Sequence, residues 1–516
     1  MKLMQFSCFL VVGCFVGPES RLSFGPTNQD MHISLDIAQV RTLAEKGNVI
    51  PIFTTLPADM LTPVQCFLQW SQLKPNSFLF ESVLGGEHVG RYSFIGTDPL
   101  KILQATDCDP LEEIENELAK WTAVAVPGLP DFTGGAVGYI SYDCVRFFEP
   151  STERPLRDPV CVPESIMLIS DSIIVFDHLF SVVKVVSNVM ISENIPIEMA
   201  FAKAVGKLES IVAALESPTR ISVPQPPISS FEAVSNIGRE GYVGFVEKLK
   251  KHITNGDIIQ AVPSQRLKKK TNLHPFNAYR TLRTVNPSPY MFYIDYGDFQ
   301  LVGASPEMMV KVTPERRVET HPIAGTRHRG ETEVEDQRLA EELLADHKER
   351  SEHIMVPPLI QLVDLGRNDI NRVCEPDTVK VDSLMHIEKY AHVMHIVSCV
   401  GGILRPDQTQ FDAFRSVFPA GTLSGAPKVR AMQLIYELEK EKRGVYGGAV
   451  GYFGFSKTID TCIAIRTMVF KNGHVYLQAG GGIVHDSDAE AEYIETINKL
   501  KSNVVALEKA ENACKQ

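Results

Sequence analysis

The chain has 516 residues, of which 44% are hydrophobic and 22% are charged, as is usual for soluble globular enzymes. Its 51 basic and 63 acidic side chains give a formal net charge of −12, which excludes a general nucleic-acid binder that needs a basic face for phosphates. None of its ten cysteines form a C-x-x-C pair, which excludes a zinc ribbon and a thioredoxin-like pair and indicates mostly buried, reduced thiols.

Residues 1–30 are expected to be an extension, either signal-like or a gene-model artefact. Lys2 precedes the apolar run Phe6–Val16, which fits a signal-peptide core and is too short to span a bilayer. The small-residue cleavage pattern is poor, because Gly17 leads into Pro18. We therefore expect a cytoplasmic protein that has no membrane contact and whose first domain begins at Met31.

Composition also indicates the domain organisation. Residues 31–215 alternate short apolar strands with turns, and the run Ile173–Val186, rich in valine, isoleucine and phenylalanine, suits a sheet. Residues 216–235 predict a linker, since 216–230 hold four prolines and four serines. Residues 236–510 follow as a glycine-punctuated second domain.

Two helices are predicted from capping boxes and periodicity. The first runs from about Glu333 to Met355, with Thr332 and Glu335 as its capping box. The second follows Q-A-G-G-G-I-V, with Ser487 and Glu490 as its capping box. Its apolar side is predicted from a helical repeat of Ile494, Ile497, Leu500, Lys501, Val504 and Leu507. Glu492, Glu495 and Lys499 fall in a separate arc, which spacing alone predicts to be a solvated face with an i, i+4 ion pair.

Several motifs could bind an anion. Gly480–Gly482 precede a helix N-terminus, where backbone N–H groups and the helix dipole favour negative charge, although a tight turn alone would also explain them. The segment Thr422–Lys428 resembles an anion-binding turn without the P-loop pattern. Arg466 ends an apolar strand, where an arginine is either salt-bridged in the core or a carboxylate clamp.

Two further residues suggest a metal and an acid or base. Glu352 closes the acidic helix, and carboxylates on two helices near glycine turns fit a magnesium site, which needs one or two protein carboxylates. His395 lies in the apolar stretch Y-A-H-V-M-H-I-V, where it is either a core residue or a partly buried proton donor.

Ten motifs, taken together and in order, point to one family. Residues 31–510 resemble anthranilate synthase component I, a chorismate-utilising enzyme family. The matching motifs are F-L-F-E-S (Phe78–Ser82), G-R-Y-S-F-I-G (Gly90–Gly96), G-G-A-V-G-Y-I-S-Y-D (Gly134–Asp143), G-D-I-I-Q-A-V-P-S-Q-R (Gly256–Arg266), N-P-S-P-Y-M-F-Y (Asn286–Tyr293), H-P-I-A-G-T-R (His321–Arg327), H-K-E-R-S-E-H (His347–His353), L-V-D-L-G-R-N-D (Leu362–Asp369), Y-G-G-A-V-G-Y (Tyr446–Tyr452) and Q-A-G-G-G-I-V (Gln478–Val484).

The resemblance implies an α+β fold with large antiparallel β-sheets packed face to face, helices outside and the site between the sheets. It implies Mg²⁺ as cofactor, with Glu352 and Glu495 as its ligands, and catalytic roles for His395, Thr422 and Glu352. The residues that it implies for chorismate binding are Gly325, Thr326, Tyr446, Arg466, Gly480, Gly481, Gly482 and Lys499.

The implied reaction converts chorismate and ammonia to anthranilate and pyruvate, the first step of tryptophan biosynthesis. The chain lacks a glutaminase, so a partner amidotransferase subunit is expected to supply ammonia from glutamine. Aminodeoxychorismate synthase is an alternative that Ala324 disfavours, because those enzymes carry a lysine there. An isochorismate or salicylate synthase, which would need a lysine base, and a non-catalytic binding relative are further alternatives.

The resemblance also implies feedback inhibition by L-tryptophan, with its binding residues at Glu81, Ser82, Pro289, Tyr290 and Met291. The family's usual leucine is replaced by Phe80. One segment departs from the family pattern: Val356–Gln361 separate Met355 from Leu362, and their two consecutive prolines cannot continue a helix. We expect a retained intron or gene-model error here, with a natural loop insertion as the alternative.

Overall fold

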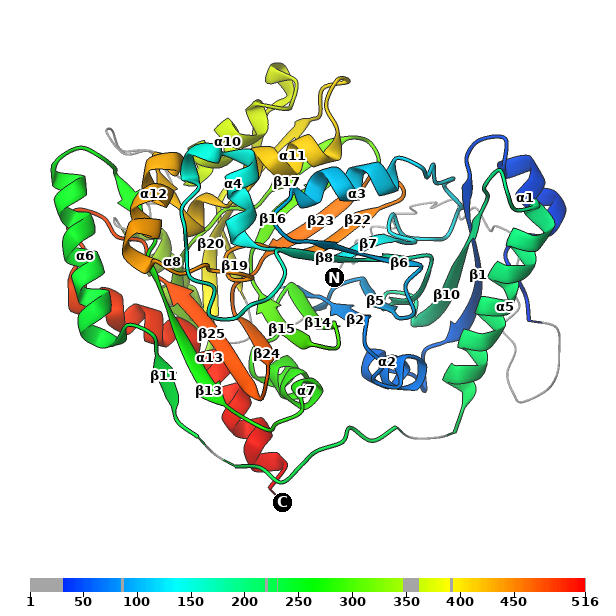
Figure 1. Cartoon of the computed structure of the whole chain (residues 1–516), viewed down its shortest axis with the longest axis horizontal. Helices are drawn as coiled ribbons and strands as arrows, with labels where there is room; N and C mark the ends of the chain where they lie inside the picture. The colour runs from blue at the N-terminus through cyan, green and yellow to red at the C-terminus, as the bar shows by residue number, and fades with distance from the viewer. Residues whose placement is uncertain are drawn as a thin grey trace, which may run out of the picture.

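The computed structural model describes residues 31–84, 88–218, 221–229, 231–346, 362–389 and 393–515. Two large antiparallel sheets, with helices on their outer sides, form the body of the protein (Figure 1). The predicted α+β class is therefore confirmed.

Within the described residues, the first sheet has eleven strands. Their order is β1 (Val49–Pro57), β10 (Val182–Met190), β9 (Ser172–Asp177), β5 (Tyr92–Gly96), β2 (Ser77–Glu81), β14 (Tyr290–Asp295), β15 (Phe299–Ser305), β24 (Thr467–Lys471), β25 (His474–Gly480), β13 (Ser264–Lys270) and β11 (Ala233–Ser235). The valine-rich run predicted as sheet forms the hairpin of β9 and β10.

The second sheet has ten strands in the same described ranges. Their order is β18 (Ile323–His328), β20 (Val393–Ile403), β17 (Arg317–Thr320), β16 (Met308–Val312), β23 (Ile459–Ile463), β22 (Ala449–Gly454), β7 (Gly135–Ile140), β8 (Ser165–Ser170) and β6 (Lys101–Ala105), with β19 (Lys380–Lys389) also pairing with β20. Two small pairs complete the strands: β12 (Gln260–Ala261) with β21 (Gly425–Ala426), and β3 (Val83–Leu84) with β4 (His88–Val89).

The helices pack on the outer faces of the two sheets. They are α1 (Ile37–Leu43), α2 (Pro63–Ser71), α3 (Pro110–Leu118), α4 (Val145–Phe148), α5 (Ile197–Glu216), α6 (Gly238–Thr254), α7 (Pro275–Val285), α8 (Glu333–Ala345), α10 (Leu362–Asn371), α11 (Gln410–Val417), α12 (Lys428–Glu439) and α13 (Ala489–Ala513). Short 3₁₀ turns are η1 (Tyr142–Cys144), η2 (Pro150–Thr152), η3 (Pro376–Thr378) and η4 (Gly421–Leu423).

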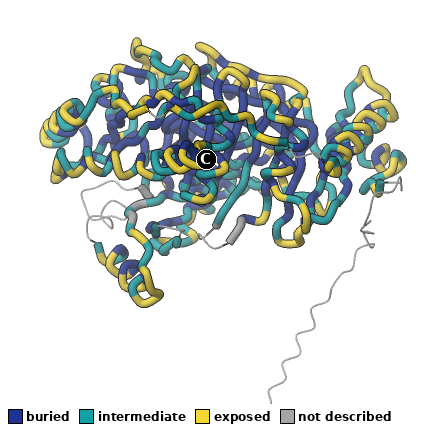
Figure 2. The backbone as a smooth tube through the Cα atoms, turned by 90° about the horizontal axis from the view of Figure 1, so that it is seen from below, coloured by how far each residue is buried: buried dark blue, intermediate teal, exposed yellow. Residues whose placement is uncertain are grey.

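The core is layered because successive side chains of a strand point to opposite faces. In β2, Phe78 packs in the cluster between the two sheets, whereas Leu79 packs in the cluster under the helices of the first sheet. In β7, Tyr139 joins the cluster between the sheets and Ile140 joins the cluster on the outer side of the second sheet. Figure 2 shows the buried residues concentrated through the middle of the molecule and the exposed ones at its rim.

Both sheets continue across the expected linker. Strand β2 pairs with β14 in the first sheet, and β7 pairs with β22 in the second, so each sheet joins segments from both sides of residues 216–235. Residues 221–229 carry no helix or strand, and the end of the expected linker forms β11 against β13.

The two predicted helices form, with corrections at their ends. Thr332 caps α8 by accepting the N–H of Glu335, but the Glu335 carboxylate accepts the N–H of Glu331, so the capping box is incomplete. The described part of this helix ends at Ala345, and both Glu352 and Val356–Gln361 lie outside the described residues.

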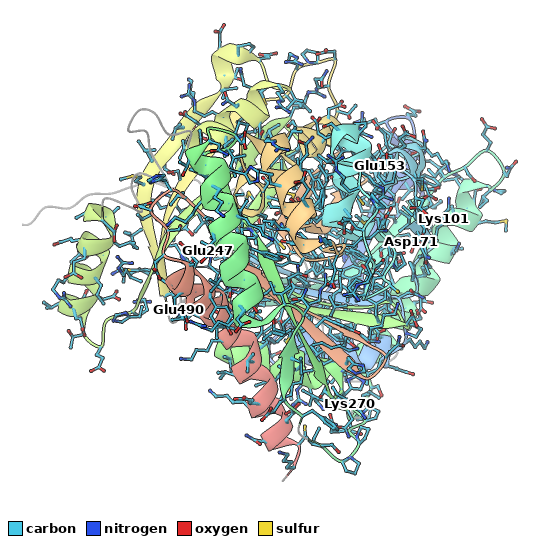
Figure 3. The ribbon with its side chains drawn as sticks, turned by 60° about the vertical axis from the view of Figure 1, so that its left-hand side comes forward. Lys101, Glu153, Asp171, Glu247, Lys270 and Glu490 are labelled. Atoms are coloured by element: carbon cyan, nitrogen blue, oxygen red, sulfur yellow. The ribbon has the colours of Figure 1, made fainter. Side chains whose placement is uncertain are left out.

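The predicted cap of the second helix is wrong. Asp488 caps α13 by accepting the N–H of Ala491, while the Ser487 hydroxyl donates to Glu492. Glu490 pairs instead with Arg239 of α6, which lies against α13 (Figure 3). No helix in the described ranges combines the length and apolar character that a membrane crossing needs.

Candidate active site

A cavity of about 760 Å³ lies where β18 and β20 of the second sheet approach β25 of the first sheet and helix α13. We call it the main cavity, and its volume suits a small organic ligand. The residues predicted from the sequence that line it are Gly325, His395, Thr422, Tyr446, Arg466, Gly480, Gly482, Glu495 and Lys499. The fold thus brings together residues that lie up to about a third of the chain apart.

Gly325 creates an irregularity in β18 that orients His395. The register of β18 against β20 shifts between Ala324 and Arg327, and Gly325 adopts a φ of +65°, a conformation that favours glycine. Its carbonyl oxygen is therefore within 2.9 Å of His395 Nδ1. Thr326 follows in the same strand, and its side chain is outside the described part of the structure.

His395 is a neutral side chain at physiological pH. Burial and the nearby Arg466 together lower its pKa to about 4, although the hydrogen bond with Gly325 raises it. A neutral imidazole that donates through Nδ1 to a carbonyl presents an acceptor at Nε2. This neutral state suits His395 to accept a proton, and the catalytic role expected from the sequence stays a prediction.

Glu307 is a site residue that the sequence reasoning missed. It follows β15, is 6% exposed and lines the main cavity. Burial raises its pKa to about 8, although the Thr422 hydroxyl donates to its Oε1 at 3.1 Å. Glu307 therefore carries a proton at pH 7. The available signal was a lone acid within the apolar segment L-V-G-A-S-P-E-M-M-V.

Arg466 is a buried cation of the main cavity, whose lining also includes Arg327 and Lys499. Burial lowers its pKa, whereas Tyr446, Glu307 and Glu495 raise it, and an arginine remains charged under such conditions. Its backbone has a φ of +51°, an uncommon conformation for a residue with a side chain and one often found at functional sites. Burial raises the pKa of Tyr446 to about 12, so its hydroxyl is a neutral hydrogen-bonding group.

The three glycines of Q-A-G-G-G-I-V have different roles. Gly480 and Gly482 line the main cavity, whereas Gly481 does not, since its N–H donates to the Tyr242 hydroxyl at 3.0 Å. A Cβ on Gly480 would lie 2.4 Å from the Pro263 carbonyl oxygen, so a side chain does not fit there. Lys499 Nζ donates to the Gly480 carbonyl oxygen at 3.0 Å and so joins α13 to this turn.

Helix α13 turns a different face to solvent than predicted. Glu495 and Lys499 form the expected i, i+4 pair at 2.6 Å, but they line the main cavity. Glu492 is 4% exposed and buried, while Ile494 and Ile497, predicted on the apolar side, are 49% and 38% exposed. Tertiary packing therefore overrides the arc predicted from spacing.

The donor set partly fits a magnesium ion. Glu495 presents a carboxylate to the main cavity, where one or two protein carboxylates with water and substrate satisfy Mg²⁺. Glu352, the second ligand that the resemblance implies, lies outside the described residues. Among the residues that are described, no group of three or more histidine, cysteine or acidic side chains could hold a metal by itself.

A second cavity of about 420 Å³ lies between the two sheets beside β2 and β14. All five residues predicted for the inhibitor line it: Glu81, Ser82, Pro289, Tyr290 and Met291. The Tyr290 hydroxyl donates to Asp460 at 2.9 Å, and a Cβ on Gly90 would clash with Ser82 Oγ at 2.4 Å, so Ser82 is closely packed.

The Glu81 carboxylate is already paired within the fold. It accepts hydrogen bonds from the Tyr279 hydroxyl at 2.5 Å and from Arg283 Nη2 at 2.8 Å, and both donors belong to α7. Its side chain is 9% exposed. Glu81 therefore joins the second cavity to α7, which packs on α13.

The two cavities share a wall. Pro306 and Ile323 line both of them. The segment 286–291 also spans both, because residues 286–288 line the main cavity and residues 289–291 line the second.

Comparison with known proteins identifies the family of this chain. The model of the chorismate binding enzyme family matches residues 75–504, and the chain belongs to that family. A relative from Schizosaccharomyces pombe, described as a probable anthranilate synthase component 1, is 56% identical over 489 residues, covering 93% of this chain and 98% of the relative. Anthranilate synthase component 1 of Saccharomyces cerevisiae is 50% identical over 500 residues, covering 93% and 97%.

Solved structures show the same architecture. Anthranilate synthase component I from Streptococcus pneumoniae TIGR4 superposes with a TM-score of 0.72 at 37% identity, covering 86% of this chain and 98% of that chain. The menaquinone-specific isochorismate synthase from Escherichia coli superposes with a TM-score of 0.69 at 18% identity, covering 91% and 98%, and shares the fold.

Proposed function

We propose that this chain is the large, chorismate-using subunit of an anthranilate synthase, which converts chorismate and ammonia to anthranilate and pyruvate. The observation that carries the proposal is the set of three groups in the main cavity. These are a protonated Glu307, a neutral His395 and the cationic Arg466. The sequence relationship to component 1 subunits supports the same conclusion.

Substrate binding follows from the charges of the main cavity. Chorismate carries two carboxylates, and Arg466 would bind the enolpyruvyl carboxylate in its planar fork. Backbone groups of Gly325, Gly480 and Gly482, which line the main cavity, would contact the rest of the substrate. Mg²⁺ held by Glu495 and Glu352 would act as a Lewis acid on the ring carboxylate.

The first chemical step needs an acid. Ammonia adds at C2 of the ring, both ring double bonds shift by one position, and the C4–oxygen bond breaks. Glu307 donates its proton to the departing hydroxyl, which leaves as water. Its raised pKa is suited to this task because the carboxyl is still protonated at neutral pH. Thr422 holds the Glu307 carboxyl in place through its hydroxyl.

The second step needs a base. His395 Nε2 removes the proton at C2, the C3–oxygen bond breaks so that the enolpyruvyl group leaves as the enolate of pyruvate, and the ring becomes aromatic. The enolate takes up a proton from water at its methylene carbon and becomes pyruvate. The hydrogen bond from His395 Nδ1 to Gly325 fixes the tautomer that accepts at Nε2. Free ammonia is the nucleophile, since Ala324 occupies the position where an aminodeoxychorismate synthase carries its lysine.

The ammonia would come from a partner amidotransferase subunit that hydrolyses glutamine, and the complex would work in the cytoplasm. L-Tryptophan would bind in the second cavity and inhibit by displacing Pro306, Ile323 or the segment 286–291, which also line the main cavity. The hydrogen bonds of Glu81 to α7 offer a second way for tryptophan in the second cavity to affect the main cavity, because α7 packs on the helix that carries Glu495.

The test is anthranilate fluorescence from chorismate, Mg²⁺ and ammonium salt, with and without tryptophan. We expect turnover without a partner subunit, loss of turnover with a magnesium chelator, and inhibition by tryptophan. A product that becomes fluorescent only after addition of a separate lyase would favour an aminodeoxychorismate synthase. Binding of chorismate without any turnover would indicate a non-catalytic relative.

A further inference from the structure

We propose that Arg443 is a positioning residue for the reaction, which joins three separate wall segments of the main cavity and holds Thr422 and Tyr446 in place. The inference rests on the proposed function, and it concerns a side chain that does not itself line the main cavity. Arg443 lies between α12 and β22 and its side chain is fully buried.

Arg443 directs its donors to different segments of the chain. Nη1 donates to the Leu423 carbonyl oxygen at 2.8 Å, and Nη2 donates to the Val262 carbonyl oxygen at 2.6 Å. Leu423 and Val262 both line the main cavity. The guanidinium also lies over the Tyr446 ring, 5.7 Å from its centroid.

Glu439 fixes the guanidinium in this orientation. Arg443 Nε donates to Glu439 Oε2 at 2.9 Å, and Nη2 donates to Oε1 at 2.7 Å, so the contact is bidentate. Glu439 Oε1 also accepts the Ser264 N–H at 2.7 Å and the Ser264 hydroxyl at 2.9 Å. Arg443 and Glu439 therefore form a buried pair that connects α12 and η4 to the first sheet.

The contact of Arg443 with Leu423 helps to position Glu307, the proposed general acid. Leu423 follows Thr422 in η4, and the Thr422 hydroxyl donates to Glu307. Holding the Leu423 carbonyl fixes the peptide that carries Thr422. Loss of this contact would release the hydroxyl that orients Glu307, although Arg443 touches neither side chain.

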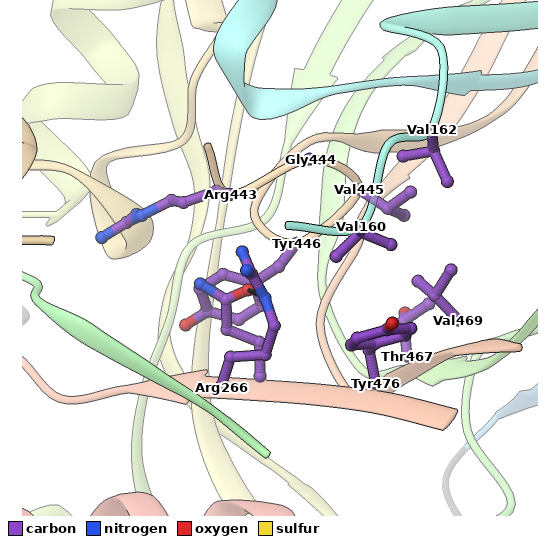
Figure 4. A pocket seen from close by; sticks show the side chains of 11 residues that line it. Val160, Val162, Arg266, Arg443, Gly444, Val445, Tyr446, Thr467, Val469 and Tyr476 are labelled. Atoms are coloured by element: carbon purple, nitrogen blue, oxygen red, sulfur yellow. Dashed lines mark hydrogen bonds between the residues drawn. The ribbon is translucent and has the colours of Figure 1, made fainter. Parts of the chain in front are cut away.

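The contact with Tyr446 prevents the ring from moving away from the substrate. A small cavity of about 20 Å³, enough for one water molecule, lies behind Tyr446. Arg443, Arg266 and Tyr446 lie on one side of it, and Val160, Val162, Val445 and Val469 lie on the other (Figure 4). Without Arg443 against it, the Tyr446 ring could shift partly toward this space.

The experiment separates positioning from stability with three variants: Arg443→Gln, Arg443→Lys and the double variant Glu439→Gln/Arg443→Gln. For each we would measure the thermal midpoint, chorismate binding by calorimetry, and kcat and KM with ammonium as the nitrogen source. Arg443→Gln leaves Glu439 buried without its partner and should lower both the midpoint and kcat. In the double variant neither charge remains, so the midpoint should recover toward the wild-type value.

The kcat of the double variant decides the proposal. We expect it to stay about 10²-fold below wild type, since displacement of a catalytic group by about 1 Å can have that effect. Arg443→Lys keeps the ion pair with Glu439 but cannot contact both carbonyl oxygens and the Tyr446 ring at once. Its kcat should therefore lie between those of the wild type and the double variant, and the decrease in kcat should exceed the increase in KM.

The control is Lys269→Gln/Glu511→Gln, a buried pair of similar exposure between β13 and α13 that is absent from the main-cavity lining. It should change the midpoint without changing kcat. Wild-type kcat in the double variant would overturn the proposal. If that variant does not fold, wild-type kcat in Arg443→Lys would overturn it. An inactive wild-type enzyme would instead contradict the proposed function.

Discussion

The substitution Glu307→Gln tests the proposed acid most directly. Glutamine keeps the shape of the side chain and an oxygen that can accept the Thr422 hydrogen bond, but it has no proton to give. Because general acid catalysis contributes about 10²- to 10⁴-fold, kcat should fall by that factor while chorismate binding is retained.

The pH dependence provides a second and more specific readout. With a pKa of about 8, Glu307 is protonated in about nine of ten molecules at pH 7 and in about one of ten at pH 9. The wild-type kcat should therefore fall as pH rises through about 8. The Glu307→Gln variant should lack this decrease.

The same group links pH to stability. The native state holds the Glu307 proton up to about pH 8, whereas the unfolded chain releases it near the ordinary value of 4.5. The native state thus binds more protons between these values, and wild-type stability should decrease as pH rises through this window, by at most about 5 kcal/mol. Glu307→Gln should lose this dependence and melt above wild type at pH 9.

Initial rates would be measured from pH 6 to 9.5 by anthranilate fluorescence at a constant concentration of free ammonia, because the ammonium salt itself titrates near the upper end. Thermal midpoints would be measured in the same buffers. Wild-type kcat in Glu307→Gln, or an unchanged decrease in rate above pH 8, would refute the assignment.

Four further outcomes are expected. Glu352→Gln and Glu495→Gln should each raise the Mg²⁺ concentration needed for half-maximal rate, because a charged ligand becomes a weaker neutral one, and unchanged magnesium titrations would contradict their role as ligands. Ser82→Phe should keep turnover and abolish inhibition, since the hydroxyl position in the second cavity becomes filled; millimolar tryptophan that leaves the wild type uninhibited would contradict this. A chain that starts at Met31 should fold and turn over chorismate in initial-rate assays, and loss of folding on that truncation would show that the extension is needed. Deletion of Val356–Gln361 should raise turnover about 10²-fold if these residues displace Glu352, whereas a full-length chain that is faster and melts higher would make the segment a genuine feature.

Most of what could be predicted came from motifs whose residues are contiguous in the sequence. Gly325, Tyr446, Arg466 and the Gly480–Gly482 turn were identified because a glycine turn or a strand-end arginine is a local pattern that resembles a known family. The sheet character of Ile173–Val186, which forms parts of β9 and β10, could also be predicted, since β-branched residues favour strands. Predictions of which face of a helix is exposed to solvent were less successful. Glu492 is buried, although its spacing predicted a solvated face.

The sequence alone determined the fold class, the family resemblance and the residue types from which a site for a dicarboxylate could be built. Only the tertiary structure decided which of these residues act together. Strand β15, which ends just before Glu307, pairs with β24, which begins just after Arg466, and Thr422 reaches the same cavity from η4. The raised pKa of Glu307 and the lowered pKa of His395 depend on burial by segments far away in the sequence. Desolvation is a property of the whole packed environment, which no local pattern of residues contains.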